Sequence, residues 1–222
     1  MKKLEIDYSK LDYFCDINDF VLISDEELSQ EGMYKNFVYA TPNNFVGIPV
    51  YPSNMPLIMN KDVWKKIKLV NKELIKHNKC ITFYDAFRPI QIQKLFWDYF
   101  FETHGKYDET LVANPQKYGT HNIKINAIDI FITNVDGSIP ELPCEFDDFS
   151  GKANIYYDNC SEEAKNNRDL LISTCIKYGF IVNENEWWHF YDERIKDYGM
   201  KKSFINSDLI PLYANEVFIL KE

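Results

Sequence analysis

The amino-acid sequence predicts an α+β fold, because helical and strand-like segments follow one another without a repeated βαβ pattern. Apolar residues recur at helical spacing after Asp62, Pro89 and Ser161. Short apolar runs typical of strands lie between and after these segments, at residues 80–84, 125–132, 180–183 and 187–191. We therefore expect a single α+β domain over residues 1–222.

Within the first 60 residues, a loop is expected at residues 29–32, and short strands and turns are expected at residues 36–60. The first 35 are acidic and mixed in character, and they end in a loop-like segment at residues 29–32. Residues 36–60 are rich in turn formers, among them Pro42, Asn43 and Gly47. We expect this region to wrap the surface of the domain.

Three helices are predicted from apolar spacing and from signals at the helix ends. The first begins at Asp62 and places lysines opposite its apolar face. The second begins at Pro89, since the first turn of a helix tolerates proline. The third has Ser161 as its N-cap and ends at Gly179.

Four strands are predicted at Cys80–Tyr84, Ile125–Ile132, Phe180–Asn183 and Trp187–Tyr191. The second of these has the composition of a buried strand but contains one acid, Asp129. Residues 133–160 look like an insertion or loop. The tail is expected to be turn-like from Lys196 until a last apolar run at Val217–Leu220.

The composition is that of an acidic globular protein. A chain of 222 residues with 45% hydrophobic residues can bury a core without needing a disulfide or a metal to fold. Its net charge of −9 argues against nucleic acid or an anionic membrane as a partner. The N-terminus lacks the apolar stretch of a signal peptide, and the five cysteines are scattered without a C-x-x-C motif. We therefore expect reduced thiols and a cytoplasmic location.

Two of the four histidines lie near acidic residues in a pattern that zinc enzymes use. His121 precedes Asp129, and His189 ends the run Glu186-Trp187-Trp188-His189. Two imidazoles and one carboxylate form a common catalytic zinc site with a fourth position for water, and Glu186 would then be the base. These residues alone also fit ordinary core or surface histidines and an aspartate paired with a lysine, so they do not decide for a metal.

The spacing of Glu186 and His189 adds a geometric condition. Side chains alternate along a regular strand, so these two residues would face opposite sides of the sheet. For both to reach one metal, we expect Glu186 to lie in the turn before the strand, where Asn183, Glu184 and Asn185 are suitable turn residues.

A third group of candidate residues surrounds Arg88, which follows a predicted strand and precedes Pro89. A guanidinium held there can bind a carboxylate or stabilise a developing oxyanion, and Asp85 can orient it. A purely structural Asp85–Arg88 pair explains the same residues.

Taken together, these segments resemble the VanX-type D-alanyl-D-alanine dipeptidases, which are zinc D,D-peptidases of the Hedgehog/DD-peptidase fold. The resemblance covers residues 36–192. It rests on Tyr39-Ala40-Thr41, Asn44-Phe45-Val46-Gly47, Tyr84-Asp85-Ala86-Phe87-Arg88-Pro89, His121 followed by Ala127-Ile128-Asp129, and Glu186-Trp187-Trp188-His189-Phe190. It implies a central antiparallel sheet with helices packed on it.

The resemblance also implies roles for individual residues. The zinc ligands would be His121, Asp129 and His189, with Glu186 as catalytic base and Arg88 stabilising the tetrahedral intermediate. Tyr39 and Asp147 would hold the free amino end of a small dipeptide substrate, with Asp148 as an alternative to Asp147. Ligand softness alone would also allow cobalt or nickel in place of zinc.

The chain departs from the family pattern at its first zinc motif. The family has seven positions from His to Asp, whereas His121 and Asp129 are separated by eight, and the motif glycine is absent. A bulge can absorb one extra residue. The motif serine is replaced by Gly119, so Thr120 is expected to supply the hydroxyl contact to substrate. Two alternatives stay open: a D,D-carboxypeptidase acting on longer wall peptides, and a non-catalytic peptide-binding protein.

Overall fold

The computed structural model describes residues 20–51, 53, 55, 57–88, 90–114 and 126–192. Their elements are β1 (Phe20–Ile23), α1 (Asp25–Gln30), β2 (Tyr34–Lys35), the 3-10 turn Val38–Ala40, β3 (Leu57–Asn60), α2 (Lys61–Ile75), β4 (Lys79–Asp85), α3 (Ile90–His104), β5 (Ala127–Asn134), α4 (Glu162–Lys177), β6 (Ile181–Asn183) and β7 (Glu186–Tyr191). The predicted α+β class is confirmed. None of the helices in these ranges is long and apolar enough to cross a membrane.

A five-stranded sheet forms the centre of the molecule, in the order β2-β4-β5-β7-β6. The pairs β4–β5, β5–β7 and β6–β7 are antiparallel, and only the short edge strand β2 runs parallel to its neighbour. The expected central antiparallel sheet is therefore confirmed. A separate two-stranded sheet joins β1 to β3.

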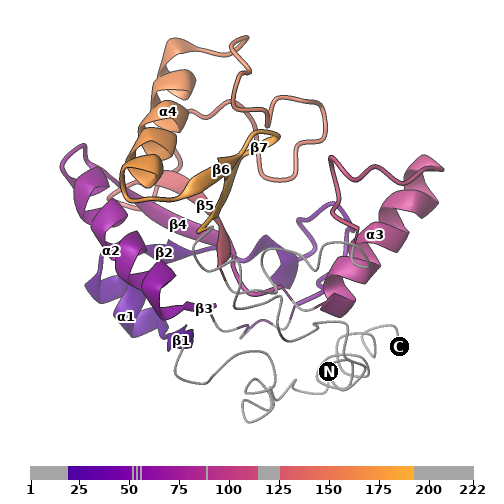
Figure 1. Ribbon diagram of the computed structural model, residues 1–222, viewed down its shortest axis with the longest axis horizontal. Helices are drawn as coiled ribbons and strands as arrows, with labels where there is room; N and C mark the ends of the chain where they lie inside the picture. The colour runs from indigo at the N-terminus through magenta and orange to yellow at the C-terminus, as the bar shows by residue number, and fades with distance from the viewer. Residues whose placement is uncertain are drawn as a thin grey trace.

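Helices α2 and α4 pack together against one face of the central sheet, and α3 lies across the molecule from them (Figure 1). On the side away from α2, Phe131 of β5 stacks on Tyr84 at 4.2 Å between ring centroids and contacts Phe146 at 6.0 Å. Strand β5 is consequently buried from Ala127 to Thr133, so its single acid, Asp129, is only 2% exposed.

The helices begin and end where the sequence indicates. Asn60 accepts a hydrogen bond from the backbone N–H of Asp62 at the start of α2, and Ser161 accepts one from Ala164 at the start of α4. Gly179 follows α4 with a φ of 81°, a left-handed conformation that glycine adopts without strain. The predicted loop at 133–160 is confirmed beyond Asn134, where β5 ends.

The N-terminal prediction was wrong in part. Strand β1 and most of helix α1 occupy a segment for which no element was predicted, and Ser29 lies within α1 instead of in the predicted loop. Helix α1 begins because Ser24 accepts a hydrogen bond from Glu27 and acidic residues occupy its first turn. It buries only Leu28, so it has no apolar repeat to detect in the sequence. The predicted run Val217–Leu220 lies outside the described residues.

Candidate active site

Three polar residues from neighbouring strands lie in one row across the sheet. Asp129 of β5 is the register partner of His189 on β7 and of Asp85 on β4. The imidazole Nδ1 of His189 lies 2.6 Å from Oδ1 of Asp129. A register irregularity between Phe83 and Asp85 marks a β-bulge, which directs Asp85 to the face that carries Asp129.

A second irregularity brings Glu186 to the same site as His189. Pairing of β6 with β7 shifts between Val182 and Asn183, so that Asn183 pairs with Glu186. The Nδ2 of Asn183 donates to Oε2 of Glu186 at 3.1 Å. The expectation that Glu186 precedes the strand was wrong, since it is the first residue of β7. The irregular pairing, and not a preceding turn, breaks the alternation of side chains.

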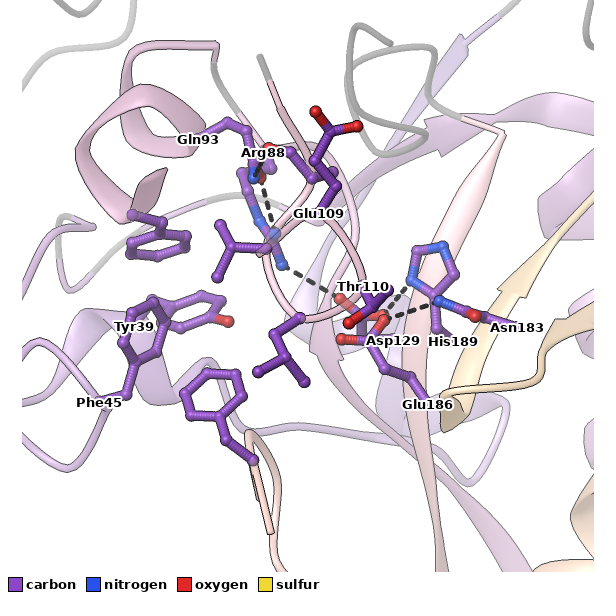
Figure 2. A pocket seen from close by; sticks show the side chains of 15 residues that line it. Tyr39, Phe45, Arg88, Gln93, Glu109, Thr110, Asp129, Asn183, Glu186 and His189 are labelled. Carbon is purple, nitrogen blue, oxygen red and sulfur yellow. Dashed lines mark hydrogen bonds and ion pairs between the residues drawn. The ribbon is translucent and has the colours of Figure 1, made fainter. Parts of the chain in front are cut away.

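Glu186, His189 and Asp129 line a cavity of about 190 Å³, which we call the active-site cavity. Figure 2 shows these three side chains gathered at one side of it, with Tyr39 and Phe45 across from them. The other lining residues are Arg88, Gln93, Phe96, Glu109, Thr110, Leu111, Val112, Ala113, Phe149 and Asn183. Residues from β5, β6, β7, α3 and several connecting segments thus meet around one cavity.

Arg88 is held by all three of its nitrogens. Its Nε donates to Oδ2 of Asp85 at 2.8 Å, its Nη1 to Oε1 of Gln93 at 2.9 Å, and its Nη2 to Oδ2 of Asp129 at 3.3 Å. Asp85 also accepts a hydrogen bond from the Tyr51 hydroxyl at 3.0 Å. The guanidinium is therefore oriented before any ligand binds, as an oxyanion-binding group has to be.

Gln93 is a member of the site that the sequence did not single out. It is 1% exposed, and its Nε2 donates to the backbone oxygen of Ala113 at 2.9 Å. Gln93 thereby joins Arg88 to the loop that forms a wall of the cavity. In the sequence, the one feature that could have pointed to Gln93 is its position near the start of α3, five residues after Arg88.

Burial and charge shift the protonation of the acidic and imidazole groups. Burial raises the pKa of the Glu186 carboxyl, although His189 lowers it in part. Burial alone would lower the pKa of the His189 imidazole, but the Asp129 carboxylate offsets this and leaves that pKa above its ordinary value. Burial also raises the pKa of Asp85, against the effect of the Arg88 guanidinium.

Tyr39 and Asp147 form a hydrogen-bonded pair at the edge of this cavity. The Tyr39 hydroxyl donates to the Asp147 carboxylate, with oxygen–oxygen distances of 3.0 and 3.2 Å. Asp147 has a φ of 59°, which is uncommon for a residue other than glycine. Burial raises the pKa of its carboxyl to about 8. Asp148 instead accepts a hydrogen bond from Ser150, so Asp147 is the residue that faces Tyr39.

The sequence of the chain is similar to that of proteins with a known activity. A sequence profile of the M15 peptidase family, described as D-ala-D-ala dipeptidase, matches residues 29–207. The chain belongs to this family. A D-alanyl-D-alanine dipeptidase of Escherichia coli (strain K12) is 26% identical to it over 152 residues, which cover 68% of this chain and 75% of that protein.

Membership in the D-ala-D-ala dipeptidase family makes the chain a metallopeptidase that acts on small peptides, and it confirms the resemblance found in the sequence. Two of the expected metal ligands, Asp129 and His189, converge at the cavity. The third, His121, and Thr120 lie outside the described residues, which contain no group of three or more metal-binding side chains. A carboxylate and an imidazole beside the half-buried Glu186 fit the donor set of a catalytic zinc site.

Proposed function

We propose that the chain hydrolyses D-alanyl-D-alanine or a closely related small dipeptide, using zinc held by His121, Asp129 and His189. The observation that carries this proposal is the Asp129–His189 pair at 2.6 Å, which shares its cavity with Glu186 and Arg88. When bound, zinc supplies Lewis-acid activation of water and of the scissile carbonyl.

Glu186 has the surroundings of a general base. Its carboxylate lines the cavity beside His189 and is fixed by Asn183 at 3.1 Å. It would take the proton of the attacking water and deliver it to the departing amine. Burial raises the pKa of Glu186, which favours the protonated form that would donate in the second step.

Arg88 would meet the negative charge that develops on the carbonyl oxygen. A single preorganised donor of this kind contributes about 3–4 kcal/mol to catalysis. Its three fixed contacts mean that little reorganisation is needed when that charge appears. Tyr39 and Asp147 would receive the substrate ammonium, and Thr120 would add a hydroxyl contact.

The decisive assay measures D-alanine release from D-alanyl-D-alanine by the zinc-loaded protein. Glu186→Gln should keep the fold and lower kcat by about 10²–10⁴-fold, the usual contribution of a positioned base. Glu184→Gln is a matched control, since Glu184 is exposed in the adjacent turn. Full activity in Glu186→Gln would show that another group is the base, and no activity in the wild type would reject the proposal.

A further inference from the structure

A second cavity adjoins the active-site cavity. Its volume is about 710 Å³, several times that of its neighbour, and Phe45 lines both. Much of its lining is apolar or aromatic and comes from β4, β5 and the loop after β5, including Phe131, Ile139, Leu142 and Phe146. The established family activity requires only a small dipeptide pocket, so this larger space is unexplained by it.

The Tyr39–Asp147 pair stands between the two cavities. Tyr39 lines the active-site cavity, whereas Asp147 lines the second cavity, and their hydrogen bond joins the two linings. If this pair holds the substrate ammonium, the amino end of the substrate lies at the boundary of the two spaces. The first side chain of the substrate is attached one atom away from that ammonium, and the second cavity is the larger of the two spaces whose linings this pair joins.

We propose that the second cavity binds the first side chain of the substrate, so that the preferred substrates are dipeptides with a free amino group and a large apolar first residue. This inference rests on the proposed function, because it takes Tyr39 and Asp147 as the amino-end contacts. It concerns the substrate class, which the chemistry of hydrolysis leaves open.

Two features of the second cavity favour a dipeptide with a free amino group and a large apolar first residue over other peptides. The aromatic lining favours an apolar side chain, and each methylene added in such a pocket changes specificity by about 10–200-fold. A substrate ammonium would stabilise the ionised form of the part-buried Asp147 carboxyl, whereas the amide of a longer peptide would offer it one neutral N–H and no charge. The site would therefore disfavour a longer wall peptide, which has no free amino group beside Asp147, while the second cavity accepts a large first side chain.

The test compares kcat/KM of the zinc-loaded protein for D-phenylalanyl-D-alanine and D-alanyl-D-alanine. Ile139 lines only the second cavity and is 62% exposed at its mouth, so Ile139→Trp narrows that cavity from outside the core. Asn43→Trp narrows it from a different segment. Ile176→Trp, on the exposed side of α4, is the matched control because Ile176 lines neither cavity.

We expect D-phenylalanyl-D-alanine to be cleaved at least as efficiently as D-alanyl-D-alanine. Ile139→Trp and Asn43→Trp should each lower kcat/KM for D-phenylalanyl-D-alanine, relative to kcat/KM for D-alanyl-D-alanine, at least tenfold. Ile176→Trp should leave this ratio unchanged. A lower wild-type efficiency for D-phenylalanyl-D-alanine, or a ratio that the variants leave unchanged, would overturn the inference while leaving the proposed function intact. Equal cleavage of N-acetyl-D-phenylalanyl-D-alanine would overturn the free-amine requirement. Failure to cleave any of these substrates would instead reject the proposed function.

Discussion

Asp129 and His189 are direct partners in the antiparallel β5–β7 pair, and their side chains touch at 2.6 Å although 60 residues separate them in sequence. This relationship depends on register. A slip of one residue between β5 and β7 would turn one of the two side chains to the opposite face of the sheet. A metal held by this pair would therefore depend on the register of the sheet that positions both side chains.

Removal of the metal is expected to abolish activity and leave the fold largely intact. The core is one large cluster of apolar side chains on both faces of the sheet, and it includes the buried residues Trp187, Phe190 and Ile130. Dialysis against a chelator should leave the far-ultraviolet circular dichroism spectrum unchanged while D-alanine release stops. Added zinc should restore D-alanine release. Loss of the spectrum together with activity would show that the metal is needed for folding.

Replacement of Arg88 by lysine should lower kcat by about 10²–10³-fold with a smaller change in KM. Lysine keeps the positive charge but cannot make the three separate contacts to Asp85, Gln93 and Asp129 that fix the guanidinium. Steady-state kinetics on D-alanyl-D-alanine measures the effect. A change in KM alone would assign Arg88 to substrate binding.

Gln93 is expected to act through Arg88. Gln93→Leu removes the contacts to Arg88 Nη1 and to the backbone oxygen of Ala113, and it leaves buried polar atoms unpaired at a cost of about 1–3 kcal/mol of stability. We expect kcat to fall more than KM rises. Gln93→Glu can still accept from Arg88 and should recover part of kcat, which a purely structural role for Gln93 would not predict.

Asp147 should make the stability of the protein depend on pH. Its folded-state pKa of about 8 exceeds the ordinary value of 3.8, because burial outweighs the opposing effect of Arg88, and Glu186 adds to the rise. The folded state therefore binds more protons than the unfolded state between these values, and stability falls as pH rises from about 4 to about 8. Asp147→Asn should flatten this slope in thermal melts across that range. An unchanged slope would show that Asp147 is ionised in the folded protein.

Much of the fold could be predicted from the sequence. Helices α2 and α4 have caps at Asn60 and Ser161 and an apolar face long enough to show its period. Strands β4, β5 and β7 are apolar runs between turn formers. Helix α1 could not be predicted, since six residues that bury only Leu28 leave no periodic signal.

The site was predictable in its residue types but not in its geometry. The motif residues Arg88, Asp129, Glu186 and His189 could be named from the sequence, whereas the row across the sheet depends on two irregularities in strand pairing. Such irregularities leave no periodic signal in the sequence, so strand alternation alone gave the wrong position for Glu186. Gln93 was missed because a glutamine on a helix carries no motif of its own.

Zinc stoichiometry, measured by mass spectrometry of the metal in purified protein, tests the central claim most directly. The wild type should bind about one zinc ion per chain. His121→Ala, Asp129→Asn and His189→Ala should each lose most of it, whereas the exposed control variants His77→Ala and Asp158→Asn should retain it. A wild type without bound zinc after zinc loading, or a His189→Ala variant that keeps it, would contradict the assignment of the metal to the Asp129–His189 pair.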